Sequence, residues 1–309
     1  MIGAGQRTFG INKFVINSKL KGIIIMAGIE KSFLKSVVAL GISTPTPKDK
    51  DHKHWVGTGF LVGFHHEKDE VYLITNKHVV QDQEVLFIRF NTLDGAPAND
   101  FPLQIKDDKG VVQFSFHPNP QIDIVAVSLN LDLLKSSNSS FDFYDLEKDV
   151  YTLEQMENNQ LHEGSLVYAL GFPMNLVDQD RQYPICRLGC ISRISNAFDI
   201  DNAVDFLVDA QTFPGNSGGP IVSRAECATS NQKMVLLGIL RAYITYQEAL
   251  FSMQTGRQRS MMEENSGLTI VHPVDRILEV VEFERKRISL LSAVPKRKIK
   301  KTPSSKIEK

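Results

Sequence analysis

The stretch Gly215-Asn216-Ser217-Gly218-Gly219-Pro220 constrains this 309-residue chain more than any other. Glycines on both sides of a serine permit tight turns with partly positive φ, which other residues resist. Such a turn can present the Ser217 hydroxyl in a cleft, and it can aim the amide N–H groups of Gly215 and Ser217 at one point, as an oxyanion hole requires. An ordinary glycine-rich turn would explain the same six residues equally well. The interpretation therefore depends on partners elsewhere in the chain.

The candidate general base is His78, within Leu73-Ile74-Thr75-Asn76-Lys77-His78-Val79-Val80. The preceding residues 71–75 are rich in β-branched and aromatic types and predict a strand, so His78 follows it where a turn begins. A histidine can take a serine proton because its unperturbed pKa lies near neutral pH. Of the other seven histidines, four are expected in solvated loops rather than as metal ligands, and three have no catalytic context: His52, His54, His65 and His66, then His117, His162 and His272.

The candidate orienting carboxylate is Asp123, which interrupts the apolar stretch 122–129. A charged residue in a strand is costly unless it is paired or hydrogen-bonded. An aspartate that accepts the Nδ1–H of a histidine meets this condition, and it would fix the tautomer and stabilise the imidazolium. The alternative is an aspartate at a strand entry that accepts from turn amides. The local pattern leaves both interpretations open.

Together these residues resemble the trypsin/chymotrypsin-fold serine peptidases, most closely the HtrA/Deg branch. The order His, Asp, Ser is the one those enzymes use, whereas other triad folds use other orders. Further segments resemble motifs of that branch in the same order, over roughly residues 36–283: 57–62, 75–80, 123–127, 169–173, 189–192, 209–210, 214–220, 237–239 and 267–273.

The resemblance implies an all-β fold of two antiparallel six-stranded barrels with a C-terminal helix. Short strand-like runs separated by turn signals agree with it. They fall in two sets of six: 36–41, 59–63, 71–75, 85–90, 111–114 and 122–129, then 165–171, 183–189, 206–210, 219–223, 234–240 and 268–272. The predicted organisation is an N-terminal extension (1–35), a first barrel (36–130), a linker (131–163), a second barrel with its packed helix (164–285) and a basic disordered tail (286–309). The helix is predicted over 274–283.

The resemblance also implies a serine endopeptidase that works through an acyl-enzyme. Ser217 would be the nucleophile, His78 the base and Asp123 the orienting group, with an oxyanion hole from the amides of Gly215 and Ser217. The substrate pocket would be lined by Gln211, Leu240, Arg241 and Ala242. Gln211 stands where trypsin-like enzymes carry a pocket-bottom aspartate, so a neutral or apolar P1 residue is expected, while Arg241 leaves an acidic P1 open. No cofactor or metal is expected.

Secreted trypsins carry an aspartate directly before the nucleophile, and it pairs with a freed N-terminal amine during activation. This chain has Asn216 there, which cannot form that ion pair. We therefore expect no activation by N-terminal cleavage. An HtrA chain often continues into a PDZ domain, and too few residues follow the predicted helix for one.

Two other functional classes stay open. A protease-fold binding module, or a latent protease that needs an activating partner, could carry the same triad. A non-peptidase hydrolase such as an esterase would also use a serine. However, an α/β-hydrolase places its histidine after the serine, and here both His78 and Asp123 precede Ser217.

Composition limits the remaining possibilities. A net charge of −1 gives no general nucleic-acid or membrane footprint, so the expected partner is a protein or peptide substrate, with the oligomeric state open.

The three cysteines, Cys186, Cys190 and Cys227, do not suit a secreted disulfide framework and are expected as buried free thiols. The apolar run 22–28 is too short for a membrane span and poor as a signal sequence, so a cytoplasmic location is expected. Met26 could be the true start. The segment 245–266 is longer than a tight hairpin needs and suggests a flap or an exposed excursion.

Overall fold

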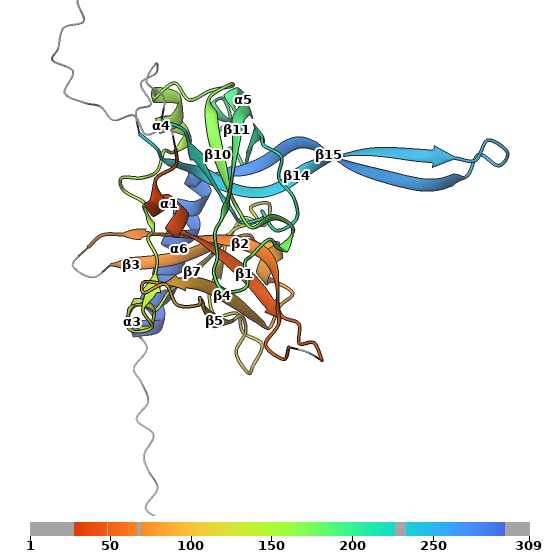
Figure 1. The fold of residues 1–309 in the computed structure, drawn as a ribbon. Helices are drawn as coiled ribbons and strands as arrows, with labels where there is room; N and C mark the ends of the chain where they lie inside the picture. Colours follow the sequence, from red (N-terminus) through yellow and green to blue (C-terminus); the bar gives the residue numbers. More distant parts are fainter. Residues whose placement is uncertain (1–27, 48, 67–68, 226–232, 294–309) are drawn as a thin grey trace, which may run out of the picture.

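The fold contains two β-sheets that share no strand, and helix α6 (Val274–Ala293) packs against both of them (Figure 1). The computed structural model describes residues 28–47, 49–66, 69–225 and 233–293. The all-β architecture with a C-terminal helix that the sequence predicts is confirmed.

The first unit is an open nine-stranded sheet. Its main path runs β5-β4-β1-β2-β3-β7-β6, with β8 paired to β4 and β9 paired to β2. It is therefore not the closed six-stranded barrel that we expected. The strands are β1 (Val37–Ser43), β2 (Lys53–Phe64), β3 (Glu70–Thr75), β4 (Val85–Thr92), β5 (Asn99–Gln104), β6 (Ser115–Phe116), β7 (Val125–Ser128), β8 (Ser139–Ser140) and β9 (Tyr144–Asp145), and the helices are α1 (Lys31–Lys35), α2 (Lys77–Val80) and α3 (Leu131–Ser136).

Strand β5 was not predicted, whereas the strand predicted at 111–114 does not form. Pro102 lies inside β5, opposite Phe87 of β4. A proline lacks the backbone donor and therefore favours an edge strand, and β5 is the edge of this sheet. In the 111–114 segment, Val112 forms only an isolated bridge with Lys106.

The second unit is a closed six-stranded barrel in the order β10-β11-β12-β15-β14-β13, as predicted. Its elements, with those that lead into it, are α4 (Leu153–Asn158), β10 (Leu166–Gly171), η1 (Pro173–Asn175), β11 (Ile185–Arg193), α5 (Ser195–Phe198), β12 (Phe206–Asp209), β13 (Pro220–Ser223), β14 (Leu236–Phe251) and β15 (Gln258–Pro273). Strands β14 and β15 continue past the barrel as a two-stranded arm, defined here as the paired residues 245–251 and 258–265, which stands away from the body (Figure 1).

One apolar cluster joins the two units. It includes Phe60 and Ile74 of the first sheet, Leu170 and Leu236 of the barrel, and Ile277 of α6, all of them fully buried. Burying a side chain of this size stabilises the fold by about 1.5–3 kcal/mol. Each unit also encloses its own smaller cluster. The shared cluster holds the two units together as one body.

Helix α6 differs from the prediction in length and in packing. It was expected to end near 283 and to pack on the second barrel, but it runs to Ala293, and it also packs on β6 and β7 of the first sheet. His117 Nε2 lies 2.8 Å from Glu279 Oε2, and the Ser115 hydroxyl donates to the fully buried Glu284 over 2.7 Å. The start of the predicted tail is therefore helical, and residues 294–309 lie outside the described part of the chain.

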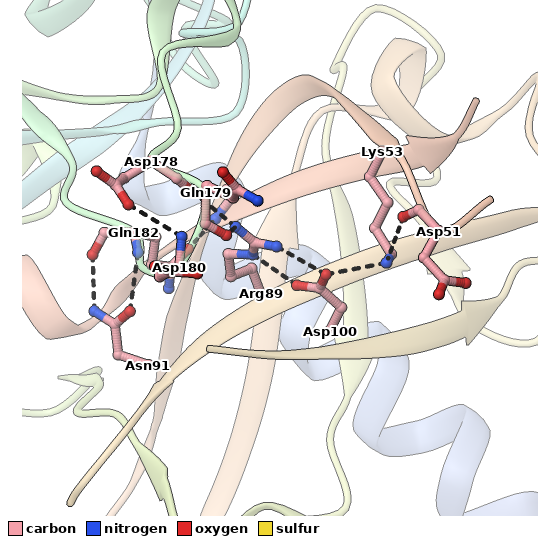
Figure 2. Close-up of polar contacts among 10 residues, drawn as sticks. Asp51, Lys53, Arg89, Asn91, Asp100, Asp178, Gln179, Asp180 and Gln182 are labelled. Carbon is pink, nitrogen blue, oxygen red and sulfur yellow. Dashed lines mark hydrogen bonds and ion pairs between the residues drawn. The ribbon is translucent and has the colours of Figure 1, made fainter. Parts of the chain in front are cut away.

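A second, polar contact docks the segment between η1 and β11 on the first sheet (Figure 2). The Arg89 guanidinium donates to both carboxylate oxygens of Asp100, over 2.7 and 2.9 Å, and to the carbonyls of Asp178 and Gln179, over 3.0 and 3.2 Å. On the same strand, β4, the Asn91 side chain exchanges two hydrogen bonds with the backbone of Gln182. This network fixes a segment that begins beside the candidate site.

Two further expectations concern single features of the chain. Cys186 is exposed and Cys190 partly exposed, so the expectation of buried thiols is wrong for both, and Cys227 lies outside the described residues. Of the helices in the described ranges, none is long and apolar enough to cross a membrane.

Candidate active site

One short helix and two loops bring His78, Asp123 and Ser217 to one cleft of about 450 Å³. His78 lies on the short helix α2 directly after β3, and Asp123 lies just before β7, both in the first unit. Ser217 lies in the turn between β12 and β13 of the barrel. The cleft therefore combines residues from both units, as predicted from their spacing in the sequence.

The side chains of His78 and Asp123 form a direct pair. His78 Nδ1 lies 2.5 Å from one carboxylate oxygen of Asp123, and the His78 backbone N–H donates to the other over 3.0 Å. Since an ionised carboxylate can only accept, the ring proton belongs on Nδ1. This tautomer leaves Nε2 with its lone pair, as a general base requires.

The environment keeps Asp123 ionised. Partial burial raises the pKa of its carboxyl, but the hydrogen bonds and charge of His78 outweigh that effect and hold the pKa below the ordinary 3.8. The Asp123 side chain is 18% exposed, against 45% for His78. The pair thus presents its histidine, and not its carboxylate, to the open side of the cleft.

Two side chains hold the backbone of Asp123. The Asn76 amide donates to the Asp123 carbonyl over 2.8 Å, and the Asp123 N–H donates to His272 Nε2 over 3.1 Å. His272 is fully buried in β15, and its Nδ1 donates to the carbonyl of Val204 over 2.7 Å. Burial lowers the pKa of His272 below the ordinary 6.5, which agrees with a neutral ring that donates at one nitrogen and accepts at the other. His272 has no catalytic context in the sequence, although a histidine at the end of the mainly apolar stretch 268–272 was a usable signal.

The turn around Ser217 requires its glycines. Gly215 and Gly218 have φ of +97° and +85°, where a side chain is strained. A Cβ on Gly215 would also collide with the carbonyl of Phe172, and one on Gly218 with the carbonyl of Thr58. The sequence therefore fixes both the shape of this turn and its close contact with the neighbouring backbone.

Thr58 of β2 connects this turn to the first unit. Its buried hydroxyl donates to the Gly215 carbonyl over 2.7 Å and accepts from the Phe172 N–H over 3.0 Å. Its own N–H donates to the Ser217 carbonyl over 2.9 Å. With the Gly215 carbonyl held on one side, the adjoining peptide units of the turn have a fixed orientation.

Two of the amides in this turn donate to no acceptor among the described residues. Asn216 and Gly218 donate their N–H groups to the carbonyls of Phe213 and Leu240, each over 3.0 Å. Within the described residues, the N–H groups of Gly215 and Ser217 donate to no protein acceptor, and no hydrogen bond links Ser217 to His78. Bonds between nucleophile and base are often long before substrate binds.

The residues that line the cleft differ in part from the predicted ones. Arg241 and Ala242 line it as expected, together with Tyr243 and Thr245, which the sequence analysis did not single out. Leu240 is instead buried in the barrel core, and Gln211 is exposed and does not line this cleft. Among the described residues, no group of three or more histidine, cysteine, aspartate or glutamate side chains could hold a metal ion.

Comparison with known proteins gives a consistent result. A family model described as a trypsin-like peptidase domain matches residues 57–227, more than half of the chain. The "Serine protease HtrA-like" of Staphylococcus aureus strain MRSA252 is 25% identical over 279 residues, which cover 84% of this chain and 31% of that protein. Its counterpart in strain USA300 is 28% identical over 200 residues, which cover 62% and 22%. The chain thus spans less than a third of the length of these curated relatives.

Solved structures with a similar fold include the HtrA-type protease AlgW with a decapeptide, at a TM-score of 0.47 and 17% identity over 82% of this chain and 65% of that one. Another is the MamO protease domain from Magnetospirillum magneticum, at a TM-score of 0.42 and 16% identity over 80% of this chain and 96% of that one.

Proposed function

This chain belongs to the trypsin-like peptidase domain family, and on that premise we propose that it is a serine endopeptidase with Ser217, His78 and Asp123 as its triad. The observation that carries the proposal is the His78–Asp123 pair, which shares a cleft with Ser217, while the N–H groups of Gly215 and Ser217 donate to no acceptor among the described residues. A solvated loop histidine or a strand-entry aspartate would not require this arrangement.

The reaction follows from these positions. The Ser217 hydroxyl oxygen bonds to the carbonyl carbon of the scissile peptide while its proton passes to His78 Nε2. The N–H groups of Gly215 and Ser217 stabilise the oxyanion. Cleavage of the C–N bond releases the amine, which takes the proton from His78, and water then hydrolyses the acyl-enzyme with His78 again as base. Asp123 keeps its charge throughout and stabilises the imidazolium.

We propose a neutral or apolar P1 preference. Asp123 supplies the one carboxylate among the residues that line the cleft, and it is already engaged by His78, which disfavours a lysine or arginine at P1. Arg241 supports the alternative of an acidic P1 residue, because this positively charged residue lines the same cleft. A peptide series that differs only at P1 (leucine, valine, lysine, aspartate) decides this point: cleavage fastest with aspartate, and lost in Arg241→Ala, would replace our assignment.

The central test is covalent labelling with a fluorophosphonate probe, which reacts with an activated serine. We expect wild-type protein to be labelled, and Ser217→Ala and His78→Ala to lose labelling while keeping the wild-type melting temperature within a few degrees. His54→Ala removes an exposed histidine of the first unit and serves as the matched control.

The competing proposal, a protease-fold binding module, predicts no labelling of folded wild-type protein. A latent protease predicts labelling only after a partner is added. Unlabelled wild-type protein with an intact melting transition would therefore overturn autonomous endopeptidase activity.

A further inference from the structure

Strand β14 leaves the barrel at the cleft itself. It pairs with β13 up to the contacts between Leu240 and Gly218–Gly219, and from Arg241 onward it pairs only with β15 within the described residues. The next residues, Arg241, Ala242, Tyr243 and Thr245, line the cleft beside Ser217. The edge of β14 that β13 covers inside the barrel therefore becomes free where the cleft begins, and it stays free along the arm to Phe251.

This free edge carries few of the charges and prolines that normally protect an edge strand, although its ladder with β15 is irregular between Tyr243 and Thr245 and between Leu250 and Phe251. Proteins block strand addition with charges, prolines, bulges or very short edges. Residues 243–251 contain no proline and a single charge, Glu248. The opposite edge of the arm, residues 258–266, carries three charges: Arg259, Glu263 and Glu264. The edge that continues from the cleft is thus the less protected of the two.

The arm also exposes large apolar side chains on both of its strands. Between 49% and 60% of the surface of each of these residues is exposed: Tyr246, Leu250, Phe251, Met261 and Met262. A two-stranded ribbon has no core of its own and gains stability from a third strand. Methionine side chains adapt to partners of different shape. The arm therefore offers both unpaired backbone groups and apolar surface to an added strand.

We propose that the free edge of β14, from Tyr243 to Phe251, binds an extended segment of the polypeptide substrate as an added β-strand. Main-chain hydrogen bonds supply affinity in this mode, and alternate side chains contact the apolar faces of the arm. The inference rests on the proposed endopeptidase function. The arm leaves the cleft in one direction, so it binds the substrate on one side of the scissile bond only.

Continuity with the cleft favours a substrate over a second copy of this chain. A peptide whose scissile bond lies at Ser217 already passes Arg241 and Ala242, where the free edge starts. Its continuation along β14 is an intramolecular step at high effective concentration. A second copy of this chain would have to pair its own edge strand with β14 without being held at the cleft.

The first experiment shortens the arm. Replacing residues 247–263 with Asn-Gly joins Tyr246 to Glu264, which face each other across the ladder, through the turn that two-residue hairpins prefer. Peptides that share one cleavage site are compared as a short form and as forms extended by eight apolar-rich residues on either side. We expect wild-type protein to show at least about a tenfold higher kcat/KM for the peptide extended on one side, as a few added hydrogen bonds would give.

The shortened variant should cleave the short peptide like the wild type and should lose the gain from the extension. An extension effect that survives in the shortened variant, or the absence of any extension effect in wild type, would overturn the inference. Failure to cleave every peptide, with no probe labelling, would instead count against the proposed function itself.

Two further measurements keep the test independent of folding of the shortened arm. A long peptide N-methylated at alternate residues of its extension loses backbone donors but keeps its side chains, and it should lose the gain. Leu250→Lys adds a charge to the free edge and should reduce the gain, whereas Ser260→Lys, on the β15 residue directly opposite, should not. If both lysine substitutions reduced the gain in kcat/KM equally, binding of substrate at β14 would be contradicted. The same holds if the protein formed a dimer that requires the arm and extended peptides were cleaved no faster than the short one.

Discussion

The backbone N–H of Asp123 donates to Nε2 of His272 across the boundary between the two units. Asp123 precedes β7 of the open sheet, and His272 belongs to β15 of the barrel, where its other nitrogen donates to Val204. A neutral imidazole thus helps to fix the position of Asp123, together with the Asn76 amide. This role needs a side chain that donates at one end and accepts at the other, which histidine provides.

Replacing His272 with leucine should therefore reduce activity without touching the cleft. The Asp123 N–H would lose its acceptor in a partly buried position, a loss that costs about 1–3 kcal/mol. We expect kcat to fall about tenfold, with a smaller change in KM, and the melting temperature to drop. His272→Gln retains a side-chain acceptor and should lose less. Wild-type kcat in His272→Leu, measured with a short peptide, would show that this contact has no positioning role.

The same residue gives a pH dependence of stability. Burial, aided by the charge of Arg241, lowers the pKa of His272, against the opposing effects of the Val204 carbonyl and the carboxylates of Asp123 and Asp205. Below pH 6.5 the unfolded chain therefore binds more protons than the folded one. The stability that the neutral ring contributes is fully present above pH 6.5 and is lost as the pH falls towards the lowered pKa. Urea unfolding between pH 7 and pH 5 should show a decline in wild type, and that decline should be smaller in His272→Leu.

Thr58 offers a test of the serine turn that leaves the triad intact. Thr58→Val keeps the shape of the side chain but loses the bonds to the Gly215 carbonyl and the Phe172 N–H. We expect kcat to fall by about tenfold or more, since an oxyanion donor that is no longer fixed loses part of its stabilising effect. Thr58→Ser retains the hydroxyl and should recover most of the activity. If valine and serine behave alike in probe-labelling rate, the hydroxyl does not control the turn.

Arg89 tests the polar contact between the units. Its guanidinium forms two hydrogen bonds with Asp100, and both side chains are largely buried, at 11% and 13% exposed. Lys53 keeps an ion pair with Asp100 over 3.1 Å when Arg89 is removed, so the expected cost is that of the lost hydrogen bonds, about 1–3 kcal/mol. Arg89→Ala should therefore unfold at clearly lower denaturant concentration. Arg89→Lys should recover only part of the loss, because an ammonium group cannot make the two-bond contact. Unfolding midpoints equal to wild type would exclude a stabilising role for this network.

Residues with a specific chemical requirement were the most predictable from the sequence. The glycines around Ser217, the histidine after one strand and the aspartate at the start of another indicated the cleft correctly. Glycines permit the positive φ of the turn, and a charged residue in a strand is unfavourable unless it has a partner. The six strands of the barrel followed from their apolar runs. The assignment of the triad as catalytic stays a prediction.

Features that depend on distant partners were missed. The residues of strand β5 include Pro102 and show no alternating or β-branched pattern that predicts a strand. The strand forms because it pairs with β4. The role of His272 depends on Asp123, 149 residues earlier in the chain. The sequence indicated that 245–266 is longer than a tight hairpin needs, but not that it forms two strands. Polar and apolar residues mix along it, so only the pairing across the ladder reveals them. Helix α6 exceeded its prediction because Glu284 and Arg287 interrupt its apolar pattern, although both are bonded to each other and to the first sheet.

The packing of α6 has a consequence for the order in which the chain is made. The segment that carries Asp123 is bonded to residues near the end of the described chain: Asp123 itself to His272, His117 to Glu279, and Ser115 to Glu284. During synthesis, His78, Asp123 and Ser217 emerge from the ribosome well before these partners. The nascent chain therefore has all three triad residues without the framework that aligns them. If the proposed triad is catalytic, we expect cleavage activity only after these later partners have been made, because they hold the segment that carries Asp123.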